Sequence, residues 1–183
     1  MKQFPLIQVG NPGFRIECRS YTVTEITSKA VKEHIKRMKY TMAKVHGVGL
    51  ADPQVGIQKQ CFVVRMLPTK YRPDIPHVRP YAVFNPVIEA SGNDTQTDWE
   101  GCFSVAKAGL FAKVRRPNTI QVRYLDEAAH EQRRTLHGLE ARIFQHEYDH
   151  LQGKIFLECD HDTADIMSAD EYRAMRKRSA EGK

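Results

Sequence analysis

Residues 146–150 read His-Glu-Tyr-Asp-His and place two metal ligands and a proton carrier within little more than one helical turn. On a helix, the side chains of His146 and His150 lie on one face, about 6 Å apart, with Glu147 beside them. Neutral imidazoles coordinate divalent cations, and the carboxylate between them can take a proton from a metal-bound water. The segment therefore predicts a hydrolytic metal site.

The surrounding residues favour a helix over 139–152. Apolar side chains recur there at helical spacing, and Gly153 follows as a residue able to take a positive φ. The residues in this pattern are Leu139, Ile143, Phe144, Tyr148 and Leu151. Two histidines on a solvated helix face would look the same, so the metal interpretation depends on a third ligand.

A catalytic metal site needs three protein ligands and one open position. Phe156 stands where the zinc-protease pattern HExxHxxGxxH has its third histidine, which excludes that pattern. Glu171 is one candidate, from a later helix. Cys102, in the segment Glu100-Gly101-Cys102-Phe103-Ser104, is the other, although a free cysteine is commonly buried as a small hydrophobic residue.

Three segments, taken in order, resemble the signature motifs of the peptide deformylase family, GxGLAAxQ, EGCLS and HExDH. Here they read GVGLADPQ, EGCFS and HEYDH, and the resemblance spans residues 4–175. It implies a metal-dependent hydrolase that removes the N-formyl group from the N-terminal methionine of newly synthesised polypeptides and releases formate.

The resemblance also implies roles for particular residues. Glu147 would be the general acid and base. The Gln54 side-chain amide and the backbone N–H of Phe103 would donate hydrogen bonds to the oxyanion that forms on the substrate. The implied metal ligands are Cys102, His146 and His150. On the strength of the resemblance the metal is Fe²⁺, with Zn²⁺, Ni²⁺ or Co²⁺ as alternatives in purified protein.

Three features depart from the family pattern. Asp52 replaces the second alanine of GLAA, where it either raises the negative potential near Gln54 or points to solvent. Residues 105–114 lack the usual Val-Pro-Gly opening, so the substrate contacts of that segment stay open. Phe103 replaces leucine, a mild change because its proposed donor is backbone.

A preference for methionine requires an apolar pocket beside the metal. Arg142 precedes His146 by one turn on the same stripe, so it either lies at the rim of the cleft or is an ordinary solvated arginine. Glu100 is expected to pair with Arg115 and Arg116 and so to hold the cysteine loop. The substrate-binding residues are predicted to be Val48, Gly49, Leu139 and Ile143.

Composition limits the remaining possibilities. The chain has 183 residues, of which 41% are hydrophobic, and no apolar run long enough to cross a membrane. Its start lacks the apolar stretch of a signal peptide, so we expect a cytoplasmic protein with reduced thiols. The Cys159-Asp160-His161 cluster is interpreted as chance. The basic segment 173–178 is either a solvated tail or a ribosome contact.

The pattern along the chain predicts an α+β fold, with small mixed or antiparallel sheets packed around a central metal-binding HExxH helix. We expect one catalytic domain over 1–183, with 163–183 as a C-terminal helix or tail. Gln54 is expected on a loop after an amphipathic helix over 31–45, and residues 68–80 in an exposed loop. Predicted strands cover 61–67, 81–90, 119–125 and 131–137.

Two other functions fit the same residues. One is a peptidase whose metal is held by His146, His150 and Glu171. The other is a non-catalytic metal-binding or ribosome-binding protein that retains the motif.

Overall fold

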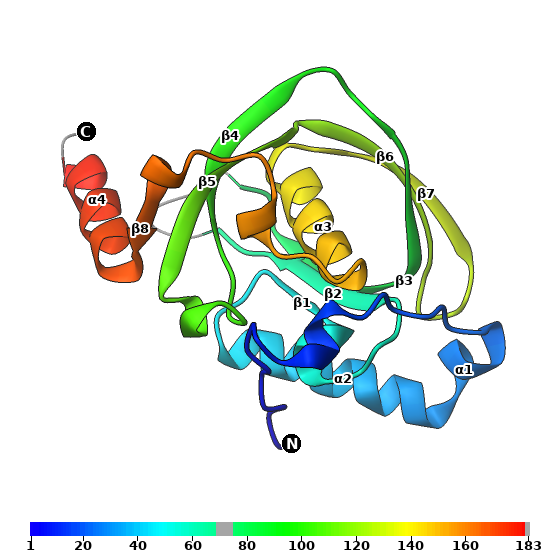
Figure 1. The fold of residues 1–183 in the computed structure, drawn as a ribbon. Coiled ribbons are helices and arrows are strands. Elements are labelled where there is room, and N and C mark those ends of the chain that lie inside the picture. The colour runs from blue at the N-terminus through cyan, green and yellow to red at the C-terminus, as the bar shows by residue number, and fades with distance from the viewer. Residues whose placement is uncertain (69–74, 182–183) are drawn as a thin grey trace.

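The computed structural model describes residues 1–68 and 75–181, and its strands form two antiparallel sheets (Figure 1). The larger sheet has the order β1-β2-β3-β6-β7, which are Gly49–Ala51, Cys61–Met66, Val78–Ser91, Thr119–Leu125 and Glu131–His137. The smaller sheet has the order β4-β5-β8, which are Thr95–Gly101, Leu110–Pro117 and Ile166–Ser168.

The α-helices are α1 (Val23–Thr27), α2 (Lys29–Lys44), α3 (Gly138–Leu151) and α4 (Ala169–Glu181). Short 3-10 helices η1 to η5 cover Pro12–Arg15, Asp52–Val55, Ala106–Ala108, Phe156–Glu158 and Thr163–Asp165. Along the described chain, each helix is too short or too polar to traverse a bilayer.

Helix α3 lies at the centre of the fold, between the two sheets (Figure 1). It contacts β1, β2, β6 and β7 of the larger sheet and β5 of the smaller one. The ring of Phe144 on α3 meets Phe62 of β2 edge-to-face, with centroids 5.0 Å apart. Burying such a ring contributes about 1.5–3 kcal/mol, which fixes the helix on the sheet. The predicted fold class, α+β with antiparallel sheets around a central helix, is confirmed.

The larger sheet is covered on both faces. Successive side chains of its strands point alternately into two hydrophobic cores, one on each face. In β2, Phe62 and Val64 join the core of α3, while Cys61 and Val63 join the core of α2. Ser28 is the N-cap of helix α2, and its side chain accepts a hydrogen bond from the Val31 N–H. The amphipathic helix expected over 31–45 is therefore present with slightly earlier bounds.

Several predicted elements differ from the structure. Gln54 lies in the 3-10 helix η2 and not on an irregular loop, because Pro53 and the positive φ of Gly56 close a tight turn there. Strand β3 starts at Val78, inside the loop predicted over 68–80, of which residues 69–74 lie outside the described chain. Strands β4, β5 and β8 were not predicted at all.

Asp52 occupies the start of η2 and is fully buried. Its carboxylate accepts a hydrogen bond from the Tyr21 hydroxyl at 2.7 Å and pairs with His34 Nε2 of α2, also at 2.7 Å. The expectation that this side chain points to solvent is therefore wrong, because the buried carboxylate joins η2 to α2. Its effect on the potential near Gln54 stays a prediction. Burial raises the pKa of Asp52, while the hydrogen bond from His34 opposes that shift.

We predict that Asp52→Ala lowers the free energy of unfolding by about 3 kcal/mol, because it leaves the polar atoms of Tyr21 and His34 without their hydrogen-bond partner. Urea denaturation measures the change. The triple variant Asp52→Ala, His34→Leu, Tyr21→Phe removes all three polar groups and is expected to recover most of the loss. A single variant as stable as wild type would show that this cluster does not hold η2.

Candidate metal centre

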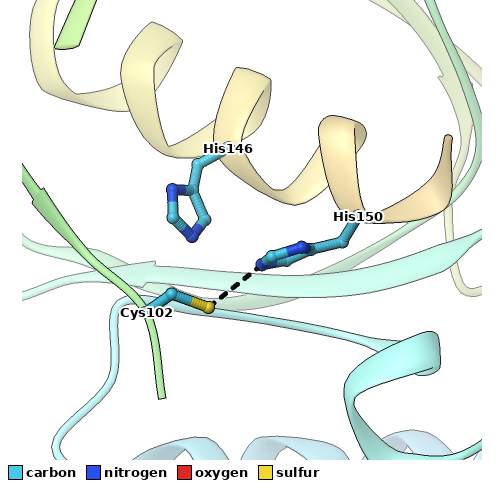
Figure 2. Close-up of side chains that lie close together, drawn as sticks. All are labelled: Cys102, His146 and His150. Atoms are coloured by element: carbon cyan, nitrogen blue, oxygen red, sulfur yellow. Dashed lines mark hydrogen bonds between the residues drawn. The ribbon is translucent and has the colours of Figure 1, made fainter. Parts of the chain in front are cut away.

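Cys102, His146 and His150 converge at one point, with the side chains directed toward one another (Figure 2). Their sulfur and imidazole nitrogen atoms all lie within 4.8 Å of one another, and the Cys102 Sγ is 3.3 Å from His150 Nε2. Cys102 directly follows β4, whereas both histidines project from one face of α3. Two neutral imidazoles and one thiolate suit a divalent transition metal such as Zn²⁺ or Fe²⁺.

The electrostatics of the group favour the form of cysteine that binds metals. Burial alone raises the pKa of the Cys102 thiol, but the charge of His150 and hydrogen bonds with His146 and His150 outweigh it and lower the pKa to about 5. The thiolate is the ligand form of cysteine. The sulfur is therefore prepared to coordinate a cation at neutral pH.

Each histidine is oriented through its second ring nitrogen. His146 Nδ1 lies 2.9 Å from Glu100 Oε2, and His150 Nδ1 lies 3.0 Å from the backbone oxygen of Lys154. Because Nδ1 is used in both rings, Nε2 is the atom that faces the cysteine. This is the usual way in which proteins fix the tautomer and direction of a metal-binding histidine.

Glu100 is the buried centre of a charge network behind the group. Arg116 of β5 donates to both carboxylate oxygens, at 2.6 and 3.0 Å, and Arg142 of α3 donates at 2.7 Å. Burial raises the pKa of Glu100, but hydrogen bonds from His146 and Arg116 outweigh this and lower it overall. Arg116 also pairs with Asp149 at 2.8 Å. The carboxylate thus stays ionised and connects β5 to α3.

Two of the predicted arginine positions need correction. Arg115 does not pair with Glu100, because it points away from the core of the sheet and pairs with exposed Asp160. Arg142 is not at a solvent-exposed rim. Its side chain is 93% buried and donates to Glu100 and to the backbone oxygen of Val114, although the residue also lines the cavity described below. The predicted pairing of Arg116 with Glu100 is confirmed.

Glu147 lies beside the group, next to β1. Its Oε2 is buried and makes no hydrogen bond within the described residues. Burial raises the pKa of this carboxyl to about 7. The side chain packs against Gly49 so closely that a Cβ at that position would lie 2.1 Å from Glu147 Oε1. Glycine is therefore required there for the carboxylate to lie beside the cysteine and histidines.

Gln54 reaches the same point from η2. Its Nε2 lies 3.4 Å from the Cys102 Sγ and 3.3 Å from the Ser104 hydroxyl, while its Oε1 accepts a hydrogen bond from the Ala51 N–H at 2.8 Å. The accepted bond fixes the amide so that its donor end faces the cysteine. Phe103 follows Cys102 in the chain, and its carbonyl accepts a hydrogen bond from the Gln8 side chain at 2.9 Å.

A cavity of about 260 Å³ opens beside these residues. All four residues predicted to bind substrate line it, and so do Cys102, His146, Glu147 and Gln54. No sequence pattern predicted its other apolar wall. Two residues of that wall come from strands that were not predicted, one from the end of the predicted strand 61–67 and one from inside the 68–80 segment. That wall consists of Leu67, Ile75, Trp99 and Phe111.

The alternative ligands lie elsewhere. Glu171 is exposed on α4 and is not part of the cysteine and histidine group, which is the single such cluster in the described chain. Cys159 contacts Asp149 at 3.3 Å, while Asp160 pairs with Arg115, so these two residues do not share a site. The four cysteines are free, as expected for reduced thiols.

Comparison with known proteins places the chain in a family. The polypeptide deformylase family model matches residues 4–164. Peptide deformylase 2 of Nostoc sp. is 35% identical over 171 residues, which cover 93% of each chain. Peptide deformylase of Leptospira biflexa is 35% identical and aligns over 84% of this chain and 85% of its own.

Solved structures agree. A Met-Ala-Ser-bound class I type b peptide deformylase from Acinetobacter baumannii superimposes with a TM-score of 0.82 and 30% identity, over 87% of this chain and 99% of that one. The Thermotoga maritima peptide deformylase gives a TM-score of 0.76 and 31% identity, over 88% of this chain and 100% of that one. This chain therefore belongs to the peptide deformylase family, hydrolases that remove the N-formyl group from nascent peptides.

Proposed function

We propose that Cys102, His146 and His150 hold one metal ion, at which this chain hydrolyses the formyl amide of N-formylmethionyl peptides. The observation that carries the proposal is the convergence of one sulfur and two imidazoles beside a buried carboxylate whose Oε2 has no hydrogen-bond partner in the described chain. A carboxylate in a purely structural ion pair would have both oxygens paired. A hydrolytic site needs an unpaired carboxylate oxygen such as this one, because that oxygen accepts the proton from water.

The metal we propose in the cell is Fe²⁺, with Zn²⁺, Ni²⁺ or Co²⁺ as substitutes in purified protein. The support is the donor set of one thiolate and two imidazoles, together with the family. When bound, the metal supplies the Lewis acidity that activates water and polarises the formyl carbonyl. Its thiolate ligand makes the site sensitive to oxidation.

The side chains of this chain are assigned the remaining steps. Glu147 takes a proton from the attacking water and delivers it to the departing amine, a task suited to a carboxyl whose pKa burial raises to about 7. The Gln54 Nε2 and the backbone N–H of Phe103 donate hydrogen bonds to the oxyanion that develops on the formyl oxygen. Neither donor carries a formal charge, and the Gln54 amide is held in place by the hydrogen bond that its Oε1 accepts from the Ala51 N–H.

Val48, Gly49, Leu139 and Ile143 are assigned to the methionine side chain, because they line the cavity next to the cysteine and histidines. A formyl carbon bears only hydrogen. A site that is narrow beside Glu147 would admit it and exclude bulkier acyl groups.

Newly synthesised polypeptides are the proposed partners. Because they are made in the cytoplasm, we propose that the protein acts there. We assign the activity to one catalytic domain over 1–183, with 163–183 as its C-terminal appendage. The basic segment 173–178 on α4 is the proposed ribosome contact. It is supported by the exposure of Arg173, Lys177 and Arg178.

We predict that Glu147→Gln lowers kcat for formate release from formyl-Met-Ala-Ser by about 10²–10⁴-fold, because the amide cannot carry the proton. The metal content is expected to stay at the wild-type level, since the three ligands are intact. Formate production and metal analysis are measured on the same anaerobic sample. A Glu147→Gln variant with wild-type kcat would refute the proton-transfer role.

A second pair of variants tests the ligand set against the peptidase alternative. Cys102→Ala is expected to lose its metal and its formate release, whereas Glu171→Ala keeps both. Metal bound per chain is measured after dialysis against a chelator. The opposite pattern, with metal retained in Cys102→Ala and lost in Glu171→Ala, would support a metallopeptidase site and contradict the assignment.

Neighbouring arginines form a matched pair for testing the charge network. Arg116→Ala leaves the buried carboxylate of Glu100 poorly compensated, so we expect unfolding free energy to fall by about 3–5 kcal/mol and metal affinity to fall about 10–100-fold. Arg115→Ala removes only an exposed pair and is expected to cost less than about 1 kcal/mol. Denaturation and chelator competition measure the two effects. Equal effects for the two variants would show that Glu100 does not support His146.

A further inference from the structure

Two aromatic side chains of the smaller sheet and one of α4 form a continuous wall, which we call the aromatic shelf: Trp99, Phe111 and Tyr172. Trp99 and Gly101 share one face of β4, and Gly101 is paired with Phe111 of β5. Phe111 therefore lies on the same face as Trp99. Both residues line the cavity that contains Cys102 and His146.

Gly101 allows the Phe111 ring to lie flat across β4. A Cβ at Gly101 would lie 2.6 Å from the Cε1 atom of that ring. The same position is thus required to be glycine for a reason that is separate from the cysteine beside it.

Tyr172 comes from α4, beyond the residues 4–164 that the family model matches. Its ring stacks on Phe111 with centroids 4.1 Å apart and an interplanar angle of 9°, and its centroid lies 5.8 Å from that of Trp99. The first turn of α4 is anchored to the residue before β5, because the Ala169 N–H donates to the Gly109 backbone oxygen at 3.0 Å. In Figure 1, α4 lies beside β5 and β8 at the outer edge of the smaller sheet. The C-terminal helix thus supports one wall of the cavity.

The two apolar walls of the cavity come from different elements. Leu139 and Ile143, assigned to methionine, belong to α3, whereas Trp99 and Phe111 belong to β4 and β5. All three shelf rings are only half-buried. A peptide whose formyl group lies at Cys102 and whose methionine contacts α3 still has the shelf available to its later residues. A second aromatic ring packed on these partly exposed rings would stabilise the complex by about 0.5–1.5 kcal/mol beyond the burial of its area.

We propose that the aromatic shelf binds an aromatic side chain at one of the two residues that follow the formylmethionine, with Tyr172 holding Phe111 in place. The proposal rests on the proposed function and names a substrate preference for it. Trp99 and Phe111 are the specificity-determining residues. Tyr172 acts through Phe111 and is a positioning residue.

The kinetic test compares formyl-Met-Ala-Ser with formyl-Met-Phe-Ser and formyl-Met-Ala-Phe. At least one phenylalanine peptide is expected to have a kcat/KM about two- to tenfold higher, expressed through KM. Phe111→Leu and Tyr172→Ala are expected to reduce this ratio toward one, whereas Tyr172→Phe keeps it because the ring is retained. Equal kcat/KM for all three peptides in the wild-type protein would overturn the proposal.

A binding test separates this proposal from the activity itself. Trp99 is the sole tryptophan of the chain, so intrinsic fluorescence reports directly on the shelf. Titration with the unformylated peptides Met-Phe-Ser and Met-Ala-Phe is expected to change Trp99 emission at lower concentration than Met-Ala-Ser, and Phe111→Leu is expected to remove the difference. If no formyl peptide yields formate, the proposed function fails, yet this titration still tests the shelf. Identical titration curves for all three peptides would refute it.

Discussion

The buried carboxylate of Glu100 is the interaction on which the arrangement of the candidate site depends. It accepts hydrogen bonds from Arg116 of β5 and from Arg142 and His146 of α3, so it joins the smaller sheet to the central helix. Cys102 lies two residues further along the chain. The carboxylate therefore sets the separation between the element that carries sulfur and the one that carries imidazole. An ionised group in this position persists only because two guanidinium groups compensate its desolvation.

Two glycines supply space that no other residue type would leave. Gly49 gives room to the Glu147 carboxylate, and Gly101 gives room to the Phe111 ring. Gly49 lies in the segment that carries the donor Gln54, and Gly101 directly precedes the candidate ligand Cys102. The same short segments therefore position polar groups and shape the cavity. This dual use explains why the cavity is apolar on its walls and polar at the end formed by Cys102, His146 and Glu147.

Local patterns predicted the parts of the fold that depend on local physics. Helical spacing placed His146 and His150 on one face, amphipathicity located α2, and runs of β-forming residues located the strands β2, β3, β6 and β7. Strand β4 was not predicted, because its sequence, TQTDWEG, is largely polar and its first half is exposed. The partners of Asp52 lie 31 and 18 residues away, so its burial has no local signal. Only the resemblance favoured Cys102 over Glu171 as the third ligand, since its contact with His150 spans 48 residues.

X-ray absorption spectroscopy of the metal-loaded protein tests the central claim, that one sulfur and two imidazoles bind the same ion. With zinc bound, the account predicts one sulfur scatterer at about 2.3 Å and two imidazole nitrogens at about 2.0–2.1 Å, with a further light atom in the open position. The sulfur contribution is expected to disappear in Cys102→Ala. A spectrum of the wild-type protein that shows only nitrogen and oxygen neighbours would contradict the account.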